Sequence, residues 1–242
     1  MSFSERINEF GALIELFIKR QGRIRNIVSI IFSDIIYPIG LYFSLSNLIS
    51  SQEFNLFLSG LLVLFTTTYV MNSVTAWLGM DKAYNYYPII RSLGPSILEY
   101  SLALIIVIML TTLPGVIILT VLSYSHLSII LLSLVVILTS SFISGFISAL
   151  LVMLFSEYTV ATTFSSVFSY VISVFPPIFY PVSILPSPWN TVLNYIYTAE
   201  AANSLKALLR DDLTAFFSSY YVLLIYLLIL ILIFIIYLNS KN

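Results

Sequence analysis

The hydrophobic positions of the chain fall into long runs that are separated by short polar segments. A helix needs about 20 consecutive apolar residues to cross the roughly 30 Å hydrocarbon core of a membrane. Six stretches meet this requirement, and we predict spans at about 27–49, 55–78, 100–122, 127–154, 158–177 and 217–238. The pattern therefore predicts an all-α integral membrane protein with six transmembrane helices, in which residues 1–242 form a single transmembrane domain.

The composition agrees with this pattern. Of the 242 residues, 60% are hydrophobic and only 9% are charged, whereas a soluble domain carries about 25% charged residues. This small number of polar side chains cannot cover the surface of a soluble protein. Lipid must therefore be the solvent for much of the chain. The composition thus predicts the lipid bilayer as the surroundings of this protein.

The segment before the first span follows a helical period without being apolar throughout. In residues 3–20 the apolar side chains recur every three to four positions, while most charges lie off that stripe. The apolar stripe consists of Phe3, Ile7, Phe10, Leu13, Ile14 and Phe17. Because the segment is too charged to span, we predict an amphipathic helix in the plane of the membrane interface.

The distribution of Lys and Arg predicts the orientation in the membrane. Cytoplasmic segments of membrane proteins are enriched in these residues. If the N-terminus is cytoplasmic, eight of the ten basic residues fall inside, and only Lys206 and Arg210 fall outside. The eight are Arg6, Lys19, Arg20, Arg23, Arg25, Lys82, Arg91 and Lys241. We therefore predict a multi-pass protein of the cytoplasmic membrane with both termini inside.

The predicted cytoplasmic segment 79–98 is longer and more aromatic than a simple connection requires. It contains Tyr84, Tyr86 and Tyr87 and ends in a glycine- and proline-containing stretch. An aromatic, mixed-charge helix at the membrane surface can dock a partner protein. Tyrosine is also enriched at membrane interfaces in general, so docking and an interfacial aromatic belt both fit the segment.

The predicted outer segment 178–216 begins with an unusual density of proline. Five prolines lie within thirteen positions from Pro176 to Pro188, so a continuous helix is impossible there. The segment nevertheless stays apolar, and irregular backbone at membrane depth is tolerated only where protein or a wet cavity surrounds it. We therefore predict a broken, re-entrant segment between spans five and six.

Polar side chains inside the predicted spans are candidates for a translocation path. Asp34 lies roughly 13 Å into the first span, where an unpaired charge is costly and is functional by default. Thr67, Asn72 and Thr163 are further candidates. Small and hydroxyl residues also allow helices to pack closely, and packing is the simpler interpretation of most of them.

Several chemistries are excluded by what the sequence lacks. There is no cysteine and only one histidine, His126, so no thiolate or multi-histidine metal centre can form within the chain. A net charge of −1 provides no basic patch for nucleic acid. No phosphate-binding loop or catalytic motif is present, so we expect no enzyme activity and no bound cofactor in this chain.

The order of these features resembles the permease subunit of type-2 ABC transporters over essentially the whole chain. An interfacial helix precedes a first span with a proline, DIIYPIGL, and a substantial cytoplasmic segment follows span two. After span five, the run FPPIFYPVSILPSPWNTVLNYI contains a Leu-Pro-x-x-Trp element, here Leu185 to Trp189. This last run is the most specific part of the resemblance.

The resemblance implies an ABC exporter in which a second permease copy, as a homo- or heterodimer, completes the substrate route. Two copies of an ATPase subunit, which carry ATP and Mg²⁺, would dock from the cytoplasm on the interfacial helix 3–20 and on the segment 79–98. The implied docking residues are Asp81, Lys82, Tyr84, Tyr86, Tyr87 and Arg91, and the implied outer gate contains Pro177, Tyr180, Pro181, Pro186 and Trp189. The expected substrate is hydrophobic or amphipathic, such as a lipid, drug or peptide. The alternative is a secondary transporter or channel subunit that an ion gradient drives.

Overall fold

The structure is a computed structural model that describes residues 3–22, 36–46, 51–92, 94–124 and 126–239. The regular structure in these ranges is helical, and they contain no strand. The helices are α1 (Phe3–Gln21), α3 (Tyr37–Ser46), α4 (Ser51–Ala83), α5 (Tyr86–Ser92), α6 (Ile97–Ser123), α7 (Leu127–Leu154), α8 (Tyr158–Val174), α9 (Trp189–Asn194), α10 (Tyr197–Leu209) and α11 (Leu213–Asn239), with a 3-10 turn η2 at Val182–Ile184.

Four helices are long and apolar enough to cross a membrane. They cover Leu56–Ala83, Ile97–Ser123, Leu127–Leu154 and Leu213–Tyr237, which correspond to the predicted second, third, fourth and sixth spans. The predicted fifth span corresponds to α8, a shorter apolar helix of 17 residues. Of the predicted first span, α3 is described, while Asp34 lies outside the described residues. An all-helical protein with several membrane-length helices is therefore confirmed, and the number six stays a prediction.

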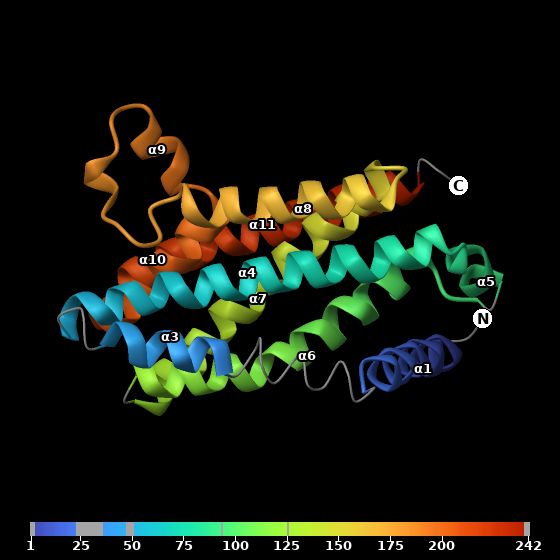
Figure 1. Cartoon of the computed structure of the whole chain (residues 1–242), viewed down its shortest axis with the longest axis horizontal. Coiled ribbons are helices and arrows are strands. Elements are labelled where there is room, and N and C mark those ends of the chain that lie inside the picture. The colour runs from blue at the N-terminus through green and yellow to red at the C-terminus, as the bar shows by residue number, and fades with distance from the viewer. Residues whose placement is uncertain (1–2, 23–35, 47–50, 93, 125, 240–242) are drawn as a thin grey trace.

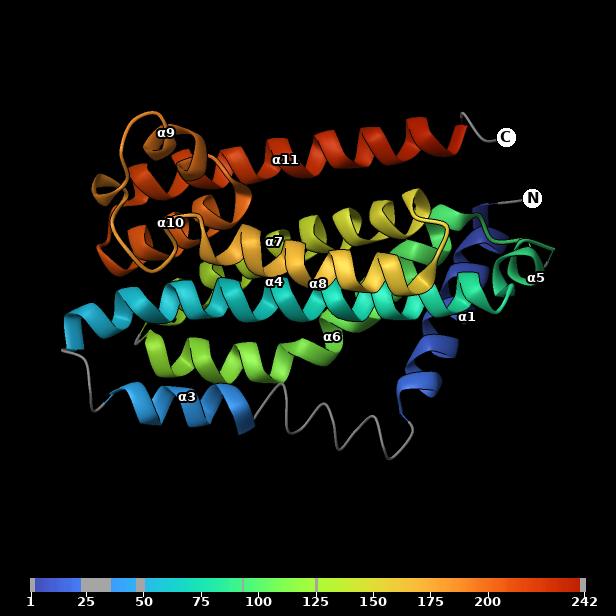
Figure 2. The same ribbon diagram turned by 45° about the horizontal axis from the view of Figure 1, so that its top comes forward.

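The long helices lie side by side along the long axis of the molecule (Figures 1 and 2). The helix α4 packs against α6, α7, α8 and α10, so it forms the centre of the bundle. Small residues permit these close approaches: a Cβ atom on Gly145 of α7 would lie 2.8 Å from the Ile105 side chain of α6. Hydroxyl groups join the helices further, since Ser148 donates to the Met71 carbonyl at 3.1 Å and Thr75 to Ser165 at 2.8 Å.

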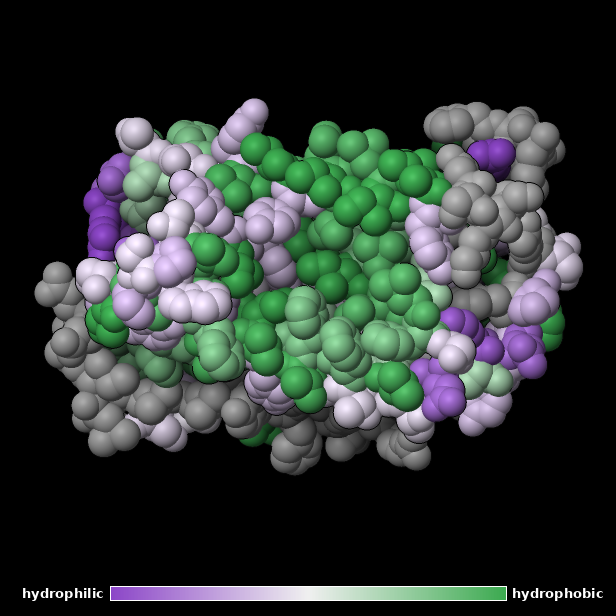
Figure 3. All heavy atoms as spheres, turned by 90° about the horizontal axis from the view of Figure 1, so that it is seen from above, coloured by the Kyte–Doolittle hydropathy of each residue, from purple (hydrophilic) through white to green (hydrophobic). Residues whose placement is uncertain are grey.

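The two ends of the bundle differ in the elements that they carry. The beginning of α1, the segment α5 and the end of α11 lie at one end, which we call the α5 end (Figure 1). The helix α1 lies across this end rather than along the bundle, and it packs on α6 (Figure 2). The opposite end carries η2 and α9, and we call it the α9 end. Between them, a continuous apolar surface extends over α8 and α11 (Figure 3).

The broken segment after α8 contains a short helix on the surface and a second helix inside the bundle. The residues of α9 are exposed or half-buried, whereas most residues of α10 are buried. The hydroxyl groups of Tyr197 and Ser144 are 2.9 Å apart, and Ser144 lies near the middle of α7. Tyr226, near the middle of α11, donates to the Tyr195 carbonyl at 2.9 Å. The turn between α9 and α10 therefore reaches about halfway down the bundle.

Candidate functional sites at the two ends of the bundle

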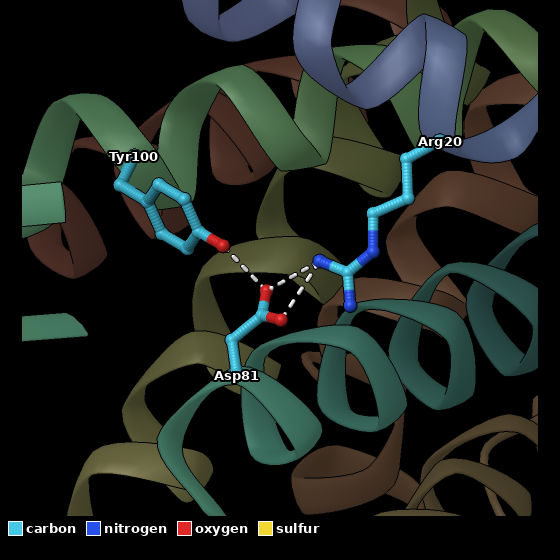
Figure 4. A network of polar contacts seen from close by, with 3 residues as sticks. All are labelled: Arg20, Asp81 and Tyr100. Atoms are coloured by element: carbon cyan, nitrogen blue, oxygen red, sulfur yellow. Dashed lines mark hydrogen bonds and ion pairs between the residues drawn. The ribbon is translucent and has the colours of Figure 1, made fainter. Parts of the chain in front are cut away.

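The α5 end contains a polar network that joins three helices (Figure 4). Asp81 in the last turn of α4 is fully buried. Its carboxylate accepts hydrogen bonds from Arg20 Nη1 of α1 at 2.7 and 3.0 Å, and a further one from the Tyr100 hydroxyl of α6. A buried carboxylate is tolerated when a cation and hydrogen-bond donors surround it. Both conditions hold here, so the network fastens α1 to α4 and α6.

Aromatic rings enclose this network on two sides. The guanidinium carbon of Arg20 lies 4.3 Å from the centre of the Trp77 ring, a geometry in which the negative face of the ring attracts the cation. The Tyr100 ring packs on Phe17 of α1 with centroids 5.0 Å apart. Phe17 and Leu13 belong to the predicted apolar stripe of α1 and are buried, whereas Ile7 of the same stripe is exposed. The C-terminal half of the stripe therefore faces the bundle.

Lys82 also binds groups of this chain rather than facing solvent alone. Its Nζ atom donates to the carbonyls of Val152 at 2.8 Å and Phe155 at 2.6 Å. These carbonyls lie at the C-terminal end of α7, where carbonyl groups have no partner within the helix and the helix dipole favours a positive charge. Lys82 therefore caps α7 from α4.

The predicted docking residues divide into an inner and an outer set. Asp81 and Lys82 face other helices because α4 continues through Ala83, beyond the predicted end of the span at residue 78. Tyr84 and Tyr86 are 65% and 45% exposed and form the accessible part of the segment. The side chains of Tyr87 and Arg91 lie outside the described part of the structure.

The structure does not gather the candidate path residues in one described site. Thr67 is fully buried in α4, and the Asn72 amide oxygen accepts a hydrogen bond from Ser166 of α8 at 3.0 Å. Thr163 is exposed on the surface of α8. Asn72 thus takes part in helix packing, and Thr67 and Thr163 face different surroundings.

The α9 end contains a pocket of about 500 Å³ beside the broken segment. Three of the predicted gate residues, Pro177, Tyr180 and Pro181, line it, whereas Pro186 and Trp189 are exposed and do not. The remaining walls are Leu56, Phe179, Val182, Asn194, Asn203, Lys206, Ala207, Arg210, Asp212, Ala215 and Ser219. A hydrogen bond of 3.1 Å between the Asn203 and Asn194 side chains holds α10 against α9 at this pocket.

The pocket has two cationic side chains that the sequence analysis did not assign to a site. Lys206 Nζ donates to the Pro177 carbonyl at 3.1 Å, which ties α10 to the proline break. Lys206 lies in the last turn of α10, outside the four long apolar helices. Its burial, together with the positive charge of the nearby Arg210, lowers the pKa of the Lys206 ammonium group to about 8.

Comparison with known proteins identifies no family for this chain. No protein-family model matches the chain, and no curated protein matches it. The described residues also contain no group of three or more His, Cys, Asp or Glu side chains that could hold a metal ion. The fold defines an all-helical protein whose long apolar helices fit a membrane, with a polar clamp at one end and a broken segment with a pocket at the other.

Proposed function

We propose that this chain is the permease subunit of an ATP-driven exporter of the type-2 ABC class. In this proposal it crosses the cytoplasmic membrane six times, with the α5 end on the cytoplasmic side and the α9 end outside. A second permease copy completes the substrate route, and two copies of a separate ATPase supply the energy from ATP and Mg²⁺. The substrate is a hydrophobic or amphipathic molecule such as a lipid, drug or peptide.

The observation that carries this proposal is the half-inserted helix α10. The N-terminal end of α10 lies near the middle of α7 and α11. A segment that only connects two spans would not need to reach this depth. A half-inserted segment needs internal hydrogen bonds or a polar cavity around its backbone. In this proposal it supplies a movable element at the outer side of a transport path. The family that the sequence resembles uses a broken segment in this position.

The helix α4 provides the mechanical connection that the proposal requires. Its 33 residues correspond to a length of about 50 Å. At one end it leads into α5 and is fastened to α1 and α6 through Asp81. Towards the other end, Gly60 packs directly on Ile178 and Phe179 of the broken segment. Movement of α5 by a docked ATPase would therefore move the α9 end through one rigid helix.

The exposed tyrosines of the docking segment supply the contact surface. Tyr84 and Tyr86 have their rings 6.1 Å apart at the end of the bundle. Aromatic side chains are enriched in protein interfaces because they bury a large area with few rotatable bonds. The buried polar network of Arg20, Asp81 and Tyr100 holds the end of α4 that precedes these tyrosines in place.

The test is reconstitution with a candidate ATPase whose coding sequence neighbours that of this chain. We expect the two proteins to co-purify, and the chain in lipid nanodiscs to stimulate ATP hydrolysis by the ATPase. A control ATPase with a substituted phosphate-binding lysine should still bind but hydrolyse no ATP. If no ATPase binds, or if binding leaves hydrolysis unchanged, the proposal is wrong.

A further inference from the structure

The pocket at the α9 end has the chemical character of a site for an amphipathic anion. Its lining combines the apolar side chains of Leu56, Phe179 and Val182 with the cationic side chains of Lys206 and Arg210. A ligand with a charged head and an apolar tail would match this combination.

The two cations lack an acidic partner. Among the described residues, neither Lys206 nor Arg210 forms an ion pair. The positive charge of the nearby Arg210 contributes to the lowered pKa of Lys206. The single acid of the lining, Asp212, has one carboxylate oxygen engaged with the backbone N–H of Ala215 at 3.0 Å. Two positive charges and one negative charge thus face a space that is partly removed from water.

In the proposed topology, Lys206 and Arg210 both lie on the outer side of the membrane. Basic residues are rare on the outer side of membrane proteins. Lys206 and Arg210 are the only basic residues that the topology places outside, and both line the same pocket. Charges that served only solubility would be spread over the outer loops instead.

We propose that this pocket binds the phosphate head group of an anionic phospholipid from the outer leaflet. The planar Arg210 guanidinium is suited to two parallel hydrogen bonds with phosphate oxygens. Lys206 has three N–H donors, of which the Pro177 carbonyl takes one. The acyl chains lie against the apolar part of the lining, which Leu56, Phe179 and Val182 provide. The outer location rests on the proposed function, but the binding itself requires no ATPase.

The experiment reports binding at the pocket rim. Because the chain contains no cysteine, Val182→Cys on the full chain can carry a small environment-sensitive dye, and the purified protein in maltoside micelles is titrated with phosphatidylglycerol or phosphatidylcholine. We expect phosphatidylglycerol to saturate the response at about tenfold lower concentration than phosphatidylcholine. Lys206→Gln/Arg210→Gln should abolish this preference.

Controls separate the pocket from general attraction to charge. Arg6→Gln/Lys19→Gln removes two exposed cations from α1 at the other end and should leave the response unchanged. Arg210→Gln alone, at an exposed position, should weaken phosphatidylglycerol binding several-fold without lowering the unfolding temperature. If the double variant unfolds, this single variant decides.

Three outcomes would overturn the inference. The first is equal binding of the two lipids, and the second is a preference that survives Arg210→Gln. The third is saturation by inorganic phosphate alone at the same concentrations, which would show a site for free phosphate rather than for a lipid. None of these results affects ATPase stimulation, so failure here is distinguishable from failure of the proposed function.

Discussion

Arg20 and Asp81 are 61 positions apart in the sequence, and the Arg20 guanidinium binds both carboxylate oxygens of Asp81 at 2.7 and 3.0 Å. The carboxylate is fully buried, while the Arg20 side chain is one-quarter exposed. This pair converts a surface helix into a fixed part of the bundle, because breaking it would leave a buried charge without its partner.

We expect Asp81→Ala to destabilise the protein and to release α1. The variant removes the buried carboxylate that Arg20 and Tyr100 bind, at a cost of about 3 kcal/mol. Thermal unfolding in detergent measures the loss, and limited proteolysis detects the release of α1. The double variant Arg20→Met/Asp81→Leu should be more stable than Asp81→Ala, because it removes both charges together.

The exposed pair between Lys19 and Glu15 on the same helix provides the matched control. Its atoms are 2.6 Å apart, but both side chains are largely exposed, so water and salt screen the attraction. Glu15→Ala should therefore leave the unfolding temperature and the proteolysis of α1 unchanged. Equal behaviour of Asp81→Ala and Glu15→Ala would show that the buried pair does not hold α1.

The sequence predicted long helices well because their length and apolarity are local properties. The predicted span 127–154 coincides with α7, since polar turns bound the apolar run on both sides. The sequence predicts the end of span two at residue 78, five residues before the end of α4 at Ala83, because charges such as Asp81 and Lys82 are typical of loops. Their partners, Arg20 and the Phe155 carbonyl, are distant in sequence, so no local pattern reveals that these charges are buried.

The pocket was only partly predictable for the same reason. Proline density located Pro177 and Pro181 correctly at the break. Lys206 and Arg210 look in the sequence like ordinary charges of an outer loop. Only the return of α10 into the bundle brings them to the proline break, and such a return depends on packing against several helices at once.

Gly60 is expected to be essential for the position of the broken segment. A Cβ atom there would lie 2.6 Å from the Ile178 carbonyl oxygen and 2.7 Å from the Phe179 ring. Backbone cannot yield as a flexible side chain does, so Gly60→Ala should destabilise the protein by about 1–3 kcal/mol. Thermal unfolding measures this change, and a dye on Val182→Cys detects displacement of the segment.

Gly11→Ala is the matched control for this substitution. Apart from the adjacent backbone of α1 itself, no atom of the described residues lies within 4 Å of a Cβ placed on Gly11. Alanine also favours helix over glycine by roughly 0.5–1 kcal/mol. It should therefore leave stability unchanged or increase it. A Gly60→Ala protein as stable as Gly11→Ala would mean that the broken segment packs less closely on α4.

The proposed orientation can be tested with single cysteines. Tyr84 at the α5 end and Ile184 at the α9 end are 65% and 68% exposed, and the chain has no cysteine that would compete. In intact cells, a membrane-impermeant maleimide should label Ile184→Cys and spare Tyr84→Cys. Inverted membrane vesicles should show the opposite result. Labelling of both positions from the same side would contradict the topology.

Tyr84 and Lys82 are close in sequence, but Tyr84 is exposed whereas Lys82 binds carbonyls at the end of α7, so the proposed docking predicts different effects for their substitution. Tyr84→Ala/Tyr86→Ala removes exposed rings and should reduce ATPase binding and stimulation about tenfold, the effect of a typical interface anchor. Its unfolding temperature should stay unchanged, because both rings are largely exposed. Lys82→Met removes the cap on the Val152 and Phe155 carbonyls and should lower stability by about 1–3 kcal/mol.

Measuring both quantities on both variants separates docking from folding. ATPase stimulation is measured for both variants at the ATPase concentration that half-saturates the wild-type protein and at a saturating one. Lys82→Met should recover most of its activity at saturation because its contact surface is intact. The tyrosine variant should be impaired at the half-saturating concentration. If Lys82→Met alone loses ATPase binding while the tyrosine variant binds normally, the partner contacts the charged turn at the end of α4, and the exposed tyrosines belong to an interfacial aromatic belt.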